Sequence, residues 1–232
     1  GLDRWILGEF SRLEAEVIAA YEKYEFHVVY QKVSQFIAVE LSSIYHDVIK
    51  DRLYTDAANS LRRRSTQTAL HRLVTGLCQM LSPMLAFTAD EAWEFVPGKA
   101  AESVHGAEWK PVGFTGKDYE RESWKSLFVL RALALPELEK ARQAKQIGKS
   151  LEAKLTLNGT GPLLLDAKVN LDSLRELLNV SQVQLAEEGG ATVFATVSKA
   201  DGQKCERCWH WEIDVGEDAT NPTLCGRCVE AV

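Results

Sequence analysis

The sequence lacks any long apolar run: among its 232 residues, no segment approaches the ~20 apolar residues that a helix needs to cross a bilayer. It therefore predicts no membrane span. The first residues, Gly1 to Trp5, also lack the basic segment and apolar core of a secretory signal peptide. The chain does not begin with methionine, and we expect it to be a piece of a longer protein.

The chain also lacks net positive charge and has only five cysteines. Acidic residues (33) outnumber lysines and arginines (27), and the net charge of −6 gives no bulk attraction to nucleic acid. Any nucleic-acid binding would need local basic patches. Four of the five cysteines lie in two CxxC pairs, a spacing that favours a reducing compartment and a bound metal over disulfides.

The first 96 residues carry the apolar periodicity of helices. Residues 26–54 contain no proline or glycine and predict one long helix. Its expected inward stripe is Phe26, Tyr30, Val33, Ile37, Leu41, Ile44 and Val48. Further helices are expected over residues 2–22, 56–81 and 88–95, with Thr55 or Asp56 capping the third and Thr88 opening a capping box for the fourth. Together they predict an antiparallel bundle.

The rest of the chain changes character three times. Residues 97–148 read as a connector followed by another helix, over 119–146. After Gly148 the apolar period switches to two, which predicts a small α+β subdomain over 149–203. Its strands are expected at 151–157, 163–165, 183–185 and 192–197, with a helix at 171–178. Residues 204–232 form a cysteine-rich tail. The expected fold is therefore mainly α: an antiparallel helical bundle (1–96), the connector and helix, the small α+β unit, and a four-cysteine zinc ribbon or finger.

The tail holds the pairs Cys205/Cys208 and Cys225/Cys228. Two residues between thiols let each pair close on one ion, and the separation of the pairs suits a ribbon or finger. We expect one structural Zn²⁺; redox dithiols or disulfides are the alternatives. Four thiolates leave zinc with excess negative charge, which Lys204, Arg207 and Arg227 can offset. We expect His210 to be a surface or partner-contacting residue.

Aromatic and basic residues give the remaining candidates. Trp209 and Trp211 either pack beneath the metal loop, the reading that the residues favour, or display a ring for stacking on a base. Arg62, Arg63 and Arg64 are by default a solvated face and otherwise a nucleic-acid contact. Residues 146–150 resemble the end of a phosphate loop, but the glycine spacing and the order of helix and strand are wrong. The residues alone indicate no active site.

Several segments resemble the C-terminal part of bacterial isoleucyl-tRNA synthetases, which are class I aminoacyl-tRNA synthetases. The resemblance covers essentially the whole chain and ends with the two CxxC pairs. The segments are residues 2–5, 24–27, 29–32, 43–54, 63–68, 87–93, 102–105 with Trp109, and 147–153.

The resemblance implies an anticodon-binding helical bundle with a zinc-binding extension. It implies a cytoplasmic, monomeric protein whose partners are tRNA(Ile) and the catalytic and editing domains of the same enzyme. The catalytic signatures of the family, HIGH and KMSKS, are absent, so ATP would be used only outside this chain. The expected tRNA contacts are Lys50, Arg52, Tyr54, Arg62, Arg63, Arg64, Trp209 and Trp211. The rival hypothesis is a zinc-stapled helical scaffold for protein assembly; a third is a self-contained enzyme.

Overall fold

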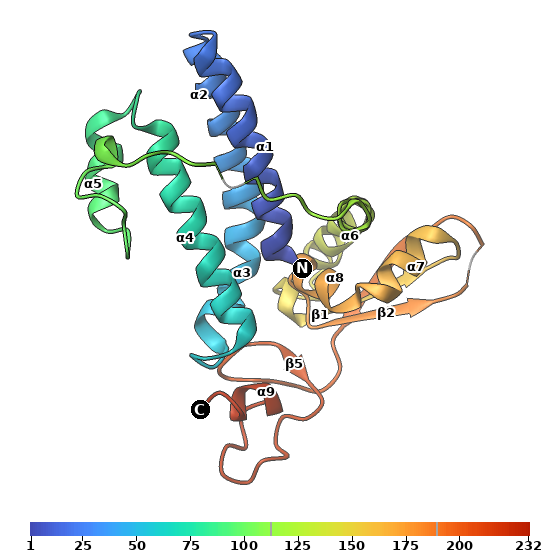
Figure 1. Ribbon diagram of the computed structural model, residues 1–232. Coiled ribbons are helices and arrows are strands. Elements are labelled where there is room, and N and C mark those ends of the chain that lie inside the picture. The colour runs from blue at the N-terminus through green and yellow to red at the C-terminus, as the bar shows by residue number, and fades with distance from the viewer. Residues whose placement is uncertain (112, 189) are drawn as a thin grey trace. The chain divides into compact units, whose positions relative to one another are not determined.

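Figure 1 shows the chain as a computed structural model that describes residues 1–111, 113–188 and 190–232. The residues group into two compact units. The first unit comprises Gly1–Ile49 and Asn59–Gly116, and the second comprises Lys50–Ala58 and Lys117–Val232. The chain therefore enters the second unit briefly, at the end of one helix, before it returns to complete the first.

The first unit is an antiparallel helical bundle, as the apolar periodicity predicts. A tight turn at residues 23–25 reverses the chain between its first two helices, and α1 packs against α2, η1 and α4. The elements are α1 (Leu2–Glu22), α2 (Phe26–Phe36), the π-helical η1 (Ile37–Tyr45), α3 (His46–Thr55), α4 (Leu61–Leu81), α5 (Ala86–Glu94) and the 3-10 turn η2 (Val104–Gly106).

The long helix is continuous in sequence from α2 to α3, but its inward stripe differs from the prediction. Phe26 and Tyr30 are exposed, and Val29 and Phe36 are buried in their place. The cause is the π-helical segment η1. A π turn closes over five residues where an α turn closes over four, so it rotates the following side chains relative to the preceding ones. A strict α period counted from the C-terminal half therefore misassigns the N-terminal half.

Two predicted helix starts were wrong. Helix α4 begins at Leu61 and not at residue 56, because the hydroxyl of Ser60 accepts a hydrogen bond from the Arg63 amide and caps the helix. Thr55 and Asp56, the predicted caps, are buried in the second unit. Helix α5 begins at Ala86 without the predicted capping box. Helix α4 ends at Leu81, as predicted.

A buried carboxylate holds three helices of the first unit together. Asp3, at the start of α1, accepts hydrogen bonds from Tyr45 Oη (2.8 Å), Ser65 Oγ (2.7 Å) and Thr66 Oγ1 (3.1 Å). These donors come from η1 and α4. Because a buried carboxylate is costly without such partners, the three bonds fix the register of the helices at this end of the bundle.

The second unit combines a helix with a small mixed sheet. Strand β1 is central, parallel to β2 and antiparallel to β3, and α6 packs against β3, α7 and α8. The alternation that predicted β1 is real, since Ala153, Leu155 and Leu157 are fully buried. The elements are α6 (Asp118–Gln143), the 3-10 turn η3 (Ser150–Glu152), β1 (Ala153–Asn158), α7 (Pro162–Val169), α8 (Leu171–Leu178), β2 (Gln182–Ala186), β3 (Phe194–Lys199), β4 (Gln203–Lys204), β5 (Trp211–Glu212) and α9 (Gly226–Val229).

One predicted strand of this unit is a helix. Residues 163–165 lie in α7, which begins with Pro162 in its first turn, a position that proline favours. The two helices α7 and α8 connect the parallel strands β1 and β2, which a short hairpin cannot do. Among the residues described, none of the helices has the length and apolar character needed to cross a membrane. The division into four parts remains a prediction.

Candidate metal centre and RNA-binding surface

The four cysteines of the tail converge. The sulfur atoms of Cys205, Cys208, Cys225 and Cys228 all lie within 4.8 Å of one another, and all four residues are buried. The short ribbon of β4 and β5 leads the first pair into this cluster, and α9 carries Cys228. The cluster, with Val215 and Leu224 beside it, is the core of the tail. The tail thus has a core made largely of thiols.

The chemistry of this donor set fits a zinc ion. Four sulfur ligands from two CxxC pairs are the usual shell of a structural zinc site. Burial opposes ionisation of Cys205, but hydrogen bonds from the amides of Cys208, Cys225 and Arg207 outweigh it and lower the pKa of the thiol to about 6. Burial raises the pKa of Cys208 to about 11. A cation that attracts thiolates would therefore favour the ionised form of thiols that burial keeps protonated.

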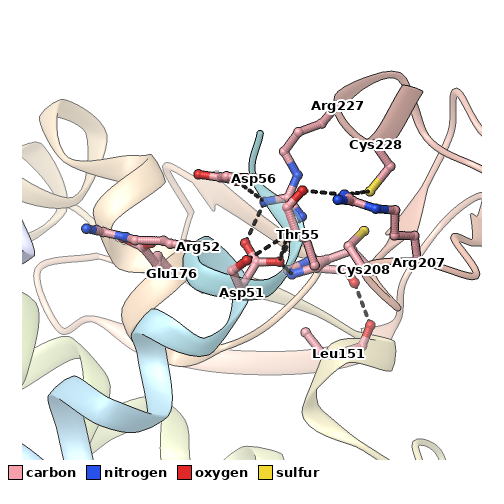
Figure 2. Close-up of polar contacts among 12 residues, drawn as sticks. Asp51, Arg52, Thr55, Asp56, Leu151, Glu176, Arg207, Cys208, Arg227 and Cys228 are labelled. Carbon is pink, nitrogen blue, oxygen red and sulfur yellow. Dashed lines mark hydrogen bonds and ion pairs between the residues drawn. The ribbon is translucent and has the colours of Figure 1, made fainter. Parts of the chain in front are cut away.

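Each CxxC pair carries an arginine immediately before its second cysteine. Arg207 Nη1 lies 3.7 Å from Cys228 Sγ and also donates to the backbone carbonyl of Thr55 (Figure 2). Arg227 donates to both carboxylate oxygens of Asp51, at 2.5 and 2.8 Å. A second carboxylate, that of Asp56, lies 3.5 Å from Arg227. Both pairs are thus connected to the end of α3, within the same unit.

The electrostatics of Asp51 follow from these contacts. Burial opposes its ionisation, but the hydrogen bonds and charge of Arg227, the nearby His210 and the hydroxyl of Thr55 prevail and hold its pKa well below the usual range. In turn, burial disfavours the charge on Arg227, and Asp51 more than offsets this and raises the pKa of the guanidinium. Asp51 and Arg227 are therefore a fully ionised pair at neutral pH.

Arg52 and His210 are not where the sequence predicts them. Arg52 was expected on the RNA surface, but it is only 5% exposed and its guanidinium binds the Glu176 carboxylate of α8 through Nε and Nη2. His210 was expected at the surface and is 9% exposed. Its Nε2 lies 3.8 Å from Asp51 Oδ1 and its Nδ1 3.4 Å from Arg175. Both side chains support the interior of the second unit.

The two tryptophans of the tail lie in different environments. Trp209 is 53% exposed, and the ammonium groups of Lys149 and Lys204 lie 5.5 and 5.6 Å from its ring centroid. It has a positive φ of 66° and its amide donates to the Cys205 carbonyl, so the backbone of the metal loop turns it outward. Trp211 is half-buried in β5, with Lys199 4.6 Å above its ring. Trp209 therefore does not pack beneath the metal loop, which was the arrangement that the sequence favoured.

The other predicted contact residues fall in both units. In the second unit, Lys50 is exposed and Tyr54 is 77% exposed. In the first unit, Arg62 and Arg63 are half-buried and Arg64 is exposed, all in the first turn of α4. The three arginines point in different directions around the helix, as consecutive residues must.

Sequence reasoning missed the ionic contacts that hold the tail to α3. It read Asp56 as a possible cap of the next helix and expected Arg207 and Arg227 only to offset the thiolates. One signal was available: an arginine occupies the same place in both CxxC pairs. It also missed Lys149, whose place beside Trp209 depends on tertiary structure.

Two known protein families match segments of this chain. The family described as "Anticodon-binding domain of tRNA ligase" matches residues 3–157, more than half of the chain. The chain therefore belongs to the family of anticodon-binding domains of tRNA ligases. A second family, described as "Zinc finger found in FPG and IleRS", matches residues 202–231, which include all four clustered cysteines.

Three similar proteins of known name are all tRNA ligases for one amino acid, isoleucine. An isoleucine–tRNA ligase of Sodalis glossinidius is 40% identical over 246 residues, which cover all of this chain and 26% of that protein. Those of Edwardsiella ictaluri and Syntrophotalea carbinolica are each 41% identical, over 100% and 98% of the chain. The chain thus spans about a quarter of the length of these relatives, 26% in each case. These findings support tRNA recognition and do not favour the scaffold hypothesis.

Proposed function

We propose that this chain is the tRNA-recognition module of an isoleucine–tRNA ligase. It would bind tRNA(Ile) and position it for aminoacylation by catalytic and editing domains outside this chain. The family match over residues 3–157 carries the proposal. The identity to isoleucine–tRNA ligases along the whole chain supports the choice of amino acid.

Base recognition needs aromatic surface, which the tail supplies. An anticodon loop presents unstacked bases that can stack on aromatic rings. The exposed ring of Trp209, with two lysines beside it, offers one stacking face together with cations for the adjoining phosphates. Trp211 offers less ring surface, because it is half-buried and Lys199 lies over its ring.

Phosphate contacts need cations at a few points, even on an acidic protein. In the second unit the proposed contacts are Lys50 and Tyr54, on the exposed side of α3. In the first unit they are Arg62, Arg63 and Arg64. Arg52 is excluded from this set because its guanidinium is buried against Glu176; its role is to stabilise the end of α3.

One structural zinc ion would be held by Cys205, Cys208, Cys225 and Cys228. Four protein ligands fill a tetrahedral shell and leave no position for water or substrate, so the metal would contribute folding energy and no catalysis. The absence of the HIGH and KMSKS signatures from the sequence supports a chain that is inactive by itself. We further propose that it is monomeric and works in the cytoplasm.

The decisive experiment compares binding of three RNAs to the purified chain: tRNA(Ile), tRNA(Ile) with a changed anticodon, and an unrelated tRNA, over a range of salt concentrations. We expect tRNA(Ile) to bind most tightly. Equal affinity for all three would refute recognition.

Metal analysis of the protein should give one zinc per chain, and a value near zero would refute the zinc site. An ATP–pyrophosphate exchange assay should be negative; an isoleucine-dependent signal would refute the absence of catalysis.

A further inference from the structure

The two CxxC pairs repeat one arrangement. In each pair the residue before the second cysteine is arginine, Arg207 in one and Arg227 in the other. Both side chains reach the C-terminal end of α3, where Arg207 bonds the carbonyl of Thr55 and Arg227 bonds the carboxylate of Asp51. Figure 2 shows the two guanidinium groups approaching this helix end from the tail.

Arg207 also contacts a thiol of the opposite pair. Arg207 Nη1 lies 3.7 Å from Cys228 Sγ, and Arg227 directly precedes Cys228 in the chain. Because hydrogen bonds to metal-bound groups orient ligands and tune their charge, Arg207 has the position of a residue that orients a metal ligand, and Arg227 ties the second pair to Asp51.

The end of α3 is a matched receptor for these cations. The C-terminal carbonyls of a helix carry partial negative charge, which Arg207 neutralises at Thr55. Asp51 and Asp56 add two carboxylates, of which Asp56 is 6% exposed. His210 lies beside Asp51, and Arg175 lies beside both His210 and Glu212. The pattern is one of complementary charge between tail and helix end.

We infer that Arg207 and Arg227 are positioning residues that couple metal binding by the four cysteines to docking of the tail on α3. The inference rests on the proposed zinc site. Metal binding draws the two pairs together and so brings both arginines to the helix end at once. The helix end in turn holds the arginines, and with them the cysteines, in the arrangement that the metal needs. Coupling of this kind is reciprocal, so a change at Asp51 must alter metal affinity.

The test uses Asp51→Asn in the intact chain, because Asp51 is not one of the residues that would hold the metal. Zinc affinity is measured by competition with a chromophoric chelator. Loss of an outer-shell partner typically weakens metal binding by about 10–100-fold, and since Asp51 acts one contact further out we expect a loss of roughly threefold to tenfold. Asp172→Asn is the matched control, because it removes the same charge from an exposed position of the same unit and should leave affinity unchanged.

A second measurement uses the unchanged protein and does not depend on how the variant folds. Hydrogen–deuterium exchange of the amides of α3 is compared before and after zinc is removed. We expect the amides at residues 50–56 to lose protection when zinc leaves. Equal zinc affinity in the Asp51→Asn variant, or unchanged protection at residues 50–56, would overturn the inference. The zinc content of the purified protein is measured separately. If it is one zinc per chain, either result refutes only the coupling and not the zinc site.

Discussion

Arg227 donates two hydrogen bonds to Asp51 across 176 positions of the chain, at 2.5 and 2.8 Å. The pair joins the cysteine-rich tail to the end of α3. The core of the tail contains few apolar residues besides the cysteines. The ionic contact with Asp51 therefore stabilises the attachment of the tail, which in larger domains is the role of a hydrophobic interface. Several properties of the protein should depend on it.

The first prediction concerns acid. The folded pKa of Asp51 lies below its unfolded value of about 3.9. The carboxylate therefore stabilises the fold fully above pH ~4, and this contribution is lost as the pH falls toward the folded pKa. Allowing for screening at the partly exposed Arg227, Asp51→Asn should cost about 1–2 kcal/mol at pH 7.

Urea unfolding of both proteins from pH 7 to pH 3, with the same excess of zinc, checks this prediction. The difference between wild type and Asp51→Asn should shrink below pH ~4, because wild type alone loses the ionised Asp51. A difference that stays constant over the whole range would contradict the assignment.

The second prediction distinguishes two cations of α3, Lys50 and Arg52, that lie two residues apart. Lys50→Gln should lower the slope of log affinity for tRNA against log salt by about one, as expected for one lost phosphate contact, and leave stability unchanged. Arg52→Gln should do the reverse: it removes the charge partner of Glu176, at a cost of up to about 3–5 kcal/mol, and keeps the salt slope. Filter binding over a salt series and thermal unfolding measure the two effects. A lower slope in folded Arg52→Gln protein would return Arg52 to the RNA surface.

The third prediction concerns stacking. Trp209→Ala should weaken tRNA binding by about 1–3 kcal/mol, the usual worth of one stacked base, while Trp209→Phe should retain most of the affinity. Circular dichroism and zinc content serve as controls, because the ring is exposed and its loss should disturb neither. If alanine at this position binds tRNA as tightly as wild type, the ring does not contact RNA.

The fourth prediction tests packing in the first unit with two glycines. A Cβ at Gly76 of α4 would lie 2.6 Å from the Phe10 ring, so Gly76→Ala should cost about 1–3 kcal/mol by overpacking. A Cβ at Gly8 of α1 meets nothing within 4 Å, so Gly8→Ala should stabilise the helix by up to about 1 kcal/mol. Urea titrations of both variants should shift in opposite directions; a Gly76→Ala variant as stable as wild type would refute the close packing at Gly76.

Much of the fold is local and could be predicted. The bounds of α1 and α8 match the apolar periodicity to the residue, and the spacing of the four cysteines alone indicates their cluster. The misses have non-local causes. No residue pattern marks the π turn that rotates Phe26 and Tyr30 outward. The predicted caps of α4 have other partners: the hydroxyl of Thr55 bonds Asp51, and the carboxylate of Asp56 lies beside Arg227.

The same limit applies to the candidate site. Lys50 and Arg52 are nearly adjacent, with the same charge, and sequence treats them alike. In a helix their side chains point in different directions, because residues two apart do not share a face. Only the arrival of Glu176 from α8 decides that Arg52 is buried and Lys50 is exposed. The outward turn of Trp209 likewise depends on its backbone in the metal loop.

The assignment of Lys50–Ala58 to the second unit has a consequence for biosynthesis. A ribosome adds roughly 5–20 residues per second, so Asp51 leaves the peptidyl-transferase centre roughly 10–30 seconds before Arg227 is added. During that interval the helical bundle can assemble, but the last turn of α3 has two acidic side chains whose tail arginines do not yet exist. We expect that turn to stay frayed until both Arg207 and Arg227 have been synthesised, so the end of α3 should acquire its native structure long after the rest of the helix.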